Sequence, residues 1–216
     1  MSELSGVLNR VICGDGVLML KNLPQKSVDL IATDPPYGIS YVSNRYKDTN
    51  PHGKIEGDGI FPDFINVAWK CLKDTGAIFT FCSHKKRIED DRVKNYIVWV
   101  KNSWTAGDLY GDFGNQYELL AFLPKPKFKL QGKRYSNVWF FDRVPPTSHP
   151  TEKPIGLMER IILCSTKKGD VVADPFLGSG TTIEACKNTS RNFIGVEINP
   201  TYCDSARKRV CQEVLF

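Results

Sequence analysis

Four consecutive residues, Asp34, Pro35, Pro36 and Tyr37, could hold a planar group that carries an exocyclic amine. They follow an apolar run at residues 28–33, which is typical of a buried strand. Each proline fixes its own φ and biases the preceding residue toward extended geometry, so this loop should be rigid. The Asp34 carboxylate and the Pro35 carbonyl could then accept the two N–H bonds of the amine while the Tyr37 ring stacks on the planar group. A plain proline turn explains these four residues equally well when they are taken alone.

A second candidate site begins with a predicted strand, a glycine-rich turn and a helix at residues 170–187. This layout brings the backbone close to a nucleotide-like ligand. The next predicted strand ends in Glu197, roughly 20 residues beyond Gly178, where an acid can accept hydrogen bonds from both hydroxyls of a ribose. A dinucleotide fingerprint would need its third glycine where Ile183 stands, so a ligand with a ribose but no pyrophosphate fits better. A glycine turn without a ligand is the alternative.

A third candidate site is the start of an amphipathic helix after residues 148–154. Thr151 could cap this helix, and Pro154 would lie early in its first turn. Free N–H groups and the Lys153 ammonium would then point to one place and attract a carboxylate. Ordinary helix capping is the alternative interpretation.

Short apolar runs alternate with helical patterns along the chain, which predicts βα units and a mainly parallel sheet. We expect one α/β domain over residues 1–216. A polar, glycine-bounded stretch at residues 38–59 predicts a mobile loop beside the site. Further strands are predicted at residues 7–13, 77–82, 96–100, 116–123 and 137–141, and further helices at residues 17–23 and 61–72.

The composition agrees with a single globular core: the chain has 216 residues, of which 41% are hydrophobic, and a formal charge of +5. Seven cysteines without a Cys-x-x-Cys pair, no signal peptide and no apolar run of membrane-spanning length favour a cytoplasmic protein with reduced thiols and no membrane contact. Only Cys82 and His84 lie close enough to suggest metal ligation. Since no second pair has ligand spacing, we expect no metal site.

Taken in order, residues 34–37, 149–154 and 174–182 closely resemble three motifs of the β class of amino-methylating DNA methyltransferases. In that class the catalytic motif precedes the cofactor motif. The resemblance extends over nearly the whole chain, from residues 13–15 to Glu197. It implies a Rossmann-like methyltransferase fold with this permuted motif order and a mostly parallel seven-stranded sheet that has one antiparallel strand. That count leaves the strand predicted at residues 137–141 without a place.

The resemblance also implies S-adenosylmethionine as the cofactor and a flipped DNA base as the target. Asp34, Pro35, Pro36 and Tyr37 would be the catalytic residues, and the aspartate at the first position favours adenine N6 over cytosine N4. Asp15 would bond the cofactor adenine amine, Glu197 the ribose hydroxyls, and Thr151 with Lys153 the methionyl carboxylate. The full implied cofactor set is Asp15, Asp34, Thr151, Lys153, Asp174, Pro175, Phe176, Gly178, Ser179, Gly180, Thr181 and Glu197.

Basic residues gather after the strand predicted at residues 116–123, where the family usually places its target-recognition region, here residues 124–148. They suit contacts with the phosphates of double-stranded DNA, although a solvated basic hairpin is the alternative. Because this region is short, the enzyme would read few base pairs or need a second subunit, which leaves open a homodimer. A companion restriction endonuclease is left open as well. The DNA-binding candidates are Lys125, Lys127, Lys129, Lys133 and Arg134.

Three other functions stay open. The first is a cytosine-N4 DNA methyltransferase. The second is a methyltransferase for RNA or protein amines, although such enzymes usually carry the cofactor motif first and asparagine in the catalytic loop. The third is a nucleic-acid-binding module without activity.

Overall fold

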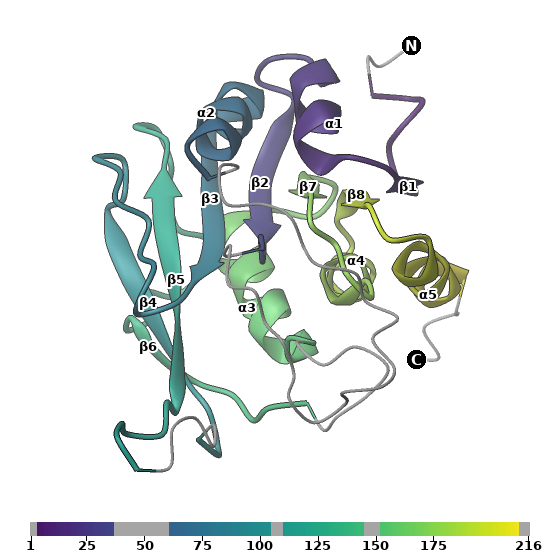
Figure 1. The fold of residues 1–216 in the computed structure, drawn as a ribbon. Coiled ribbons are helices and arrows are strands. Elements are labelled where there is room, and N and C mark those ends of the chain that lie inside the picture. The colour runs from purple at the N-terminus through teal and green to yellow at the C-terminus, as the bar shows by residue number, and fades with distance from the viewer. Residues whose placement is uncertain (1–3, 37–60, 105–109, 145–151, 212–216) are drawn as a thin grey trace.

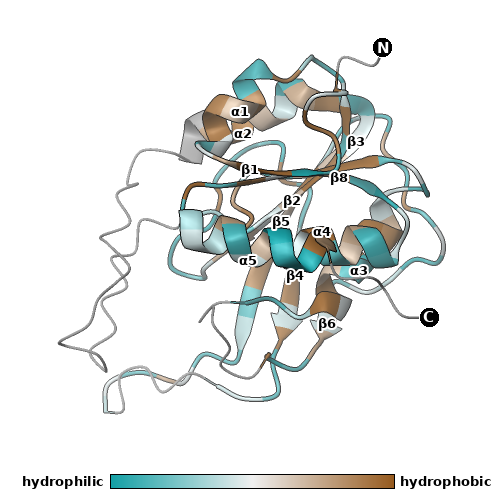
Figure 2. Ribbon diagram, turned by 90° about the vertical axis from the view of Figure 1, so that its right-hand side faces the viewer, coloured by the Kyte–Doolittle hydropathy of each residue, from teal (hydrophilic) through white to brown (hydrophobic). Residues whose placement is uncertain are grey.

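The computed structural model describes residues 4–36, 61–104, 110–144 and 152–211. In these ranges one twisted sheet lies between two layers of helices (Figures 1 and 2). The strands are β1 (Arg10–Cys13), β2 (Val28–Thr33), β3 (Leu72–Cys82), β4 (Asn95–Val100), β5 (Tyr117–Pro124), β6 (Val138–Phe140), β7 (Val171–Asp174) and β8 (Asn192–Glu197). The helices are α1 (Gly16–Asn22), α2 (Phe61–Cys71), α3 (Ile155–Ser165), α4 (Thr181–Asn188) and α5 (Pro200–Cys211). None of these described helices is long and apolar enough to cross a membrane.

The described strands pair in the order β1-β8-β7-β2-β3-β5-β4-β6. β5 runs antiparallel to both of its neighbours, and every other described pair is parallel. This confirms the predicted α/β class with one antiparallel strand. The expected count of seven strands is wrong, because the described sheet has eight. The extra strand is β6, which pairs with the outer side of β4 and buries Trp139.

Two apolar cores fill the space on the two faces of the sheet. The strands alternate their side chains between these faces, so Leu30 packs in the core beneath α3 and α4, whereas Ile31 packs in the core beneath α1 and α2. Figure 2 shows α1 and α2 on one face and α3, α4 and α5 on the other. Helix α5 follows β8 and was not among the elements predicted from the sequence.

The connections leave the middle of the sheet in opposite directions. From β2 the chain crosses through α2 to β3, and from β7 it crosses through α4 to β8 on the other side. Ligands of open α/β sheets bind at the carboxyl ends of the two strands where the order reverses in this way. Here those strands are β2 and β7, so the fold brings the residues after Thr33 and after Val171–Asp174 together. Tyr37 and the predicted loop at residues 38–59 lie outside the described residues.

Candidate active site

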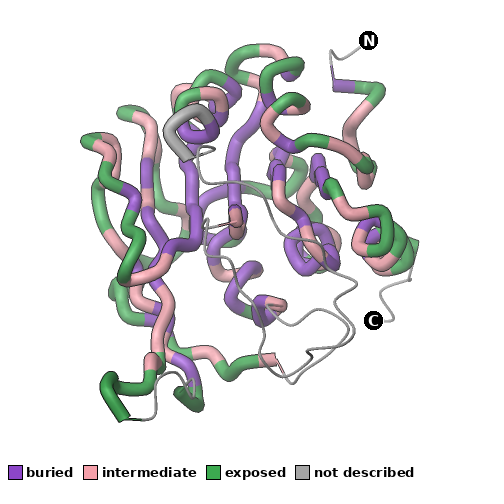
Figure 3. Tube along the Cα trace, in the orientation of Figure 1, coloured by how far each residue is buried: buried purple, intermediate pink, exposed green. Residues whose placement is uncertain are grey.

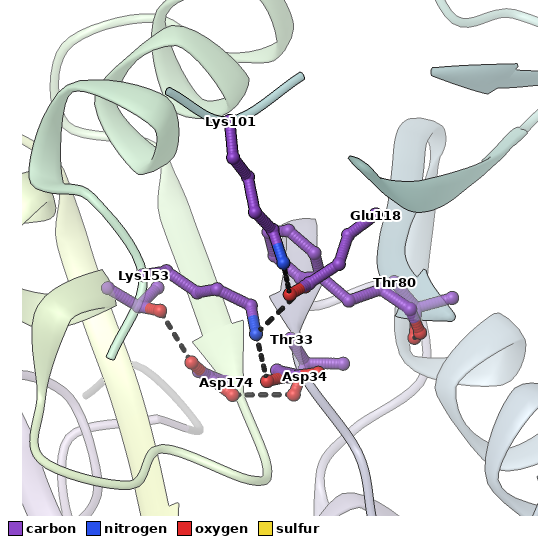
Figure 4. Close-up of polar contacts among 9 residues, drawn as sticks. Thr33, Asp34, Thr80, Lys101, Glu118, Lys153 and Asp174 are labelled. Atoms are coloured by element: carbon purple, nitrogen blue, oxygen red, sulfur yellow. Dashed lines mark hydrogen bonds and ion pairs between the residues drawn. The ribbon is translucent and has the colours of Figure 1, made fainter. Parts of the chain in front are cut away.

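A hydrogen bond joins the two central strands at their carboxyl ends. Thr33 Oγ1, at the end of β2, donates to Asp174 Oδ1, at the end of β7, over 2.6 Å (Figure 4). Asp34 is the next residue after this bond on one strand, and the glycine turn is the next segment on the other. The predicted amine-binding loop and the predicted nucleotide-binding turn therefore begin side by side at the same edge of the sheet.

Asp174 is buried and its carboxylate is used inside the protein. Besides the bond from Thr33, Oδ1 accepts from Phe176 N at 3.1 Å and Oδ2 accepts from Thr182 Oγ1 at 2.5 Å. Burial raises the pKa of Asp174 to about 6, although these hydrogen bonds act to lower it. Through these contacts Asp174, at the end of β7, links the glycine turn and the start of α4 to β2. Its direct contact with a cofactor stays a prediction.

Two glycines give the turn after Asp174 its shape. Gly178 and Gly180 have φ of 57° and 98°, in the left-handed region that favours glycine. Gly180 is the N-cap of α4, and Ser179 and Thr181 beside it are buried. The turn thus presents mainly backbone at the carboxyl end of β7.

Glu197 lies at the carboxyl end of β8, next to this turn. Its Oε2 accepts from Gly178 N and its Oε1 from Asn199 N, each at 2.8 Å. A carboxylate oxygen can accept more than one hydrogen bond, so both oxygens can still receive a hydroxyl. Asp15 lies two residues beyond the end of the neighbouring strand β1, is exposed and caps α1 by accepting from Leu18 N at 2.9 Å. Two acids beside a glycine turn provide acceptors for ribose hydroxyls and for an exocyclic amine, so this group of residues fits an adenosine-type ligand.

Lys153 contacts the catalytic candidate itself. Its Nζ lies 2.5 Å from Asp34 Oδ2 and 3.2 Å from Glu118 Oε2 (Figure 4). The sequence predicted that Lys153 would hold the carboxylate of a ligand. In this structure its ammonium is instead bound by two carboxylates of the protein, because β5 brings Glu118 to the same edge as Asp34.

The start of α3 differs from the prediction. Pro154 is the N-cap, with an extended backbone and no side-chain cap, and the helix begins at Ile155. The expectation that Thr151 caps this helix is therefore wrong, and Thr151 itself lies outside the described residues. The preceding Glu152 forms an ion pair with Arg209 of α5. This pair ties the segment before α3 to the last helix of the chain.

Sequence reasoning missed two charged residues at this edge, Glu118 and Lys101. Lys101 Nζ donates to Glu118 Oε1 at 2.6 Å. Burial alone would raise the pKa of Glu118, but the ammonium groups of Lys153 and Lys101 outweigh it and lower the pKa to about 2. Burial likewise opposes the charge of Lys153, yet Asp34 and Glu118 raise its pKa above the usual value. An acid inside the otherwise apolar strand β5 was the signal that could have revealed this cluster.

The basic residues predicted to bind DNA begin at the opposite edge of the sheet. Because β5 is antiparallel to β3, its carboxyl end pairs with the middle of β3, Pro124 opposite Ala77, and the chain then continues along the first half of β3. Lys125 N and Lys127 N accordingly donate to Gly76 O and Asp74 O there. The segment then continues along α3, where Gln131 N donates to Cys164 O. Lys125, Lys127 and Lys129 are therefore separated from Asp34 by the length of the sheet, and contact with DNA stays a prediction for the whole cluster.

Within the described ranges, no three His, Cys, Asp or Glu side chains gather closely enough to hold a metal ion. Cys82 is buried, and burial raises the pKa of its thiol to about 11, while the His84 ring packs against Tyr117.

Comparison with known proteins gives a consistent family. The family model for DNA methylases matches residues 28–208. Type II methyltransferase M.HpaI of Haemophilus parainfluenzae is 32% identical over 94% of this chain and 74% of its own length. DNA adenine methyltransferase YhdJ of Escherichia coli (strain K12) is 31% identical over 93% of this chain and 82% of its own length.

Solved structures agree with these sequence matches. The crystal structure of the M1.HpyAVI-SAM complex is similar with a TM-score of 0.69 and 29% sequence identity. The superposition covers 93% of this chain and 98% of that chain. The similarity thus extends over nearly the whole of both chains.

Proposed function

The chain belongs to the DNA methylase family, and from this premise we propose that it transfers a methyl group from S-adenosylmethionine to N6 of adenine in double-stranded DNA. The hydrogen bond between Thr33 and Asp174 is the main observation behind this proposal, because it places the amine-binding loop after β2 next to the cofactor turn after β7. Two of the relatives support the details: YhdJ is named a DNA adenine methyltransferase, and M1.HpyAVI was solved as a SAM complex.

The residues that would hold the cofactor are those around the glycine turn. Glu197 would accept the ribose hydroxyls, Asp15 the adenine amine, and the backbone of residues 176–181 would line the space between the strands. When bound, S-adenosylmethionine supplies an electrophilic methyl group on a positively charged sulfur. Thr151, also proposed to bind the methionyl carboxylate, lies outside the described residues.

Asp34 and the Pro35 carbonyl would act on the amine of a base that has been rotated out of the duplex. An exocyclic amine is a poor nucleophile because its lone pair is delocalised into the ring. Two hydrogen bonds to Asp34 and Pro35 favour a tetrahedral nitrogen and strengthen as that nitrogen becomes positive, so they stabilise the transition state more than the ground state. Once the nitrogen carries the methyl group and a positive charge, it would lose one proton to the Asp34 carboxylate, which would pass the proton to water.

Tyr37 and Pro36 complete the proposed catalytic motif. The flipped base loses its stacking in the duplex, which costs a few kcal/mol. A stacking contact with an aromatic ring recovers about 1–3 kcal/mol per base, and Tyr37 is proposed for this contact. Pro36 fixes the chain between the acceptor pair and the ring.

The loops at the carboxyl edge offer a surface for the duplex. Trp104 is 67% exposed and Phe113 is 93% exposed in the connection from β4 to β5, and large exposed hydrophobic side chains of this kind suit contacts with bases. Lys85, Lys86 and Arg87 are exposed after the carboxyl end of β3. Figure 3 shows exposed chain along this edge. We propose that this surface, rather than the cluster that begins at Lys125, faces the DNA around the flipped base.

Mass spectrometry of nucleosides tests the function directly. The purified protein is incubated with S-adenosylmethionine carrying a labelled methyl group and with DNA from a host that lacks methylation. We expect labelled N6-methyladenine after digestion, and single-molecule sequencing of the same DNA gives its sequence context. Labelled N4-methylcytosine would support the cytosine alternative. Label only in RNA or protein, or no label despite cofactor binding measured by calorimetry, would overturn the proposal.

Two partners and a location follow from the proposal. M.HpaI is named a type II methyltransferase, so we propose a companion restriction endonuclease for this chain as well. A homodimer would supply additional recognition surface, and light scattering on the purified protein measures whether it forms. YhdJ is a bacterial protein named for its action on DNA, so we propose a cytoplasmic location for this chain as well.

A further inference from the structure

Four buried or partly buried charges form a row behind the catalytic loop. They alternate in sign: the Asp34 carboxylate, the Lys153 ammonium, the Glu118 carboxylate and the Lys101 ammonium (Figure 4). The successive N–O distances are 2.5, 3.2 and 2.6 Å. The row is neutral as a whole, and only its first member, Asp34, is proposed to touch the target amine.

The surroundings make these charges depend on one another. Lys153 and Lys101 are only 9% and 7% exposed, so water can do little to screen either ammonium. The Phe81 ring lies 4.7 Å from Lys153 Nζ, and the Trp99 ring lies 5.1 Å from Lys101 Nζ. A buried cation next to aromatic rings needs a close anion, and removing one partner of such a pair leaves an uncompensated charge.

Glu118 is the only one of the four that contacts both lysines. Its Oε1 accepts from Lys101, its Oε2 faces Lys153, and its backbone in β5 is paired with Trp99 of β4. Lys101 follows β4 directly, and its backbone is paired with Gln116 just before β5 through two hydrogen bonds. The sheet therefore fixes Glu118 at a set place between the two cations.

We propose that Glu118 is a positioning residue for methyl transfer: it cancels the charge of Lys153 behind Asp34 and thereby keeps Asp34 an effective acceptor for the amine. This inference rests on the proposed function. The target nitrogen becomes positive as it takes the methyl group, so excess positive charge near Asp34 opposes the reaction. Without Glu118, two lysines would face the single carboxylate of Asp34. With Glu118 and Lys101 both neutral, the row would be balanced again.

Three variants test this electrostatic role: Glu118→Gln, Lys101→Met and the double variant. An uncompensated charge at about 7 Å in an effective dielectric of about 20 should lower kcat roughly 10- to 100-fold in Glu118→Gln. The KM for DNA and the affinity for S-adenosylmethionine, measured by calorimetry, should change much less. The double variant should regain most of the lost kcat, because it removes one charge of each sign. Lys101→Met alone should give a kcat well above that of Glu118→Gln.

A purely structural role predicts the opposite order. Two substitutions in the same buried cluster would then add their losses, and the double variant would be slower than Glu118→Gln. That result would overturn the inference, as would a wild-type kcat in Glu118→Gln. If Glu118→Gln does not fold, Lys101→Met alone tests the inference. A roughly 10- to 100-fold loss of kcat in Lys101→Met would then contradict the charge-balance role.

A readout without cofactor or DNA complements the kinetics. The free energies of unfolding in urea of the wild type and the three variants form a double-mutant cycle, in which we expect a favourable coupling between Glu118 and Lys101. Additive free energies would contradict the pairing. Asp29→Asn is the matched control, because it strips a carboxylate from the Lys73 ion pair at the other edge of the sheet; it should cost stability without lowering kcat. If the wild type methylates no DNA, the proposed function fails; if the wild type is active and Glu118→Gln is equally fast, only this inference fails.

Discussion

Thr33 and Asp174 are separated by 141 positions in the chain, and their side chains meet over 2.6 Å at the point where β2 and β7 end. The hydroxyl donates and the buried carboxylate accepts. This bond holds the loop that begins at Asp34 against the turn that contains Gly178. This hydrogen bond therefore fixes the proposed amine acceptor relative to the proposed cofactor turn.

Thr33→Val tests this relationship. It removes a donor from a buried carboxylate, which should lower the free energy of unfolding by about 1–3 kcal/mol, measured in urea. Thr80→Val is the control, since Thr80 is buried in the next strand but its hydroxyl bond, to Phe81 O, is 3.4 Å long. Equal losses of the free energy of unfolding in the two variants would show that the bond to Asp174 does not contribute more to stability than the long Thr80 bond.

Asp34→Ala should abolish methylation while S-adenosylmethionine binding stays largely intact. The variant loses an acceptor whose bonds strengthen in the transition state, and removal of one such group lowers kcat by about 10²–10³-fold. Labelled methyl transfer and calorimetry measure the two quantities separately. Asp204→Ala, which changes an exposed acid on α5, should behave as the wild type. Full activity of Asp34→Ala would refute the catalytic role.

The pKa of Asp174, raised to about 6 from 3.8, predicts a pH dependence of stability. The folded protein binds this proton more tightly than the unfolded chain, so stability falls as the pH rises from about 4 to 6, by at most about 3 kcal/mol. Glu118 acts in the opposite direction and at lower pH: its pKa is lowered to about 2, so its contribution is present above its ordinary pKa and is lost as the pH falls toward 2. Urea unfolding of the wild type and Asp174→Asn at pH 4.5 and 7 should therefore give a difference that depends on pH. A difference that is the same at both pH values would contradict the prediction.

Gly180→Ala should destabilise the protein for two separable reasons. A Cβ at this position meets Ala206 at 3.0 Å, and its φ of 98° is unfavourable for a residue with a side chain. Gly169→Ala isolates the backbone effect, because its φ is 83° but a Cβ there meets nothing within 4 Å. In urea unfolding we expect the free energy of unfolding to fall by about 1–2 kcal/mol in Gly169→Ala and by more in Gly180→Ala. Equal losses of stability in the two variants would mean that α5 shifts to accept the added Cβ without a loss of stability.

Two triple variants locate the DNA surface. Changing Lys85, Lys86 and Arg87 to alanine should reduce the slope of log K against log salt concentration by roughly 2 to 3, if each contacts one phosphate. The same change at Lys127, Lys129 and Lys133 should leave the slope nearly unaltered, because this segment begins at the other edge of the sheet. Fluorescence anisotropy at several salt concentrations measures both. The reverse outcome would return the DNA surface to the cluster predicted from the sequence.

The parts of the fold that the sequence predicted are local. The apolar run before Asp34, the glycines after Asp174 and the acid at Glu197 each lie in a few consecutive residues whose backbone preferences are strong. Their positions at strand ends are confirmed. The start of α3 differs from the prediction, because Pro154 can stand at the N-cap as well as inside the first turn.

The sequence by itself determined the α/β class, the strand ends and the family motifs, since these follow from periodicity, prolines and glycines over short stretches. Only the tertiary structure decided which charges meet. Lys153 and Asp34 are 119 positions apart, and Glu118 reaches them because β5 is inserted antiparallel beside β3. The direction of that one strand also carries Lys125 away from the site. Pairing between distant segments depends on strand order and direction, and no local preference of the chain encodes either of them.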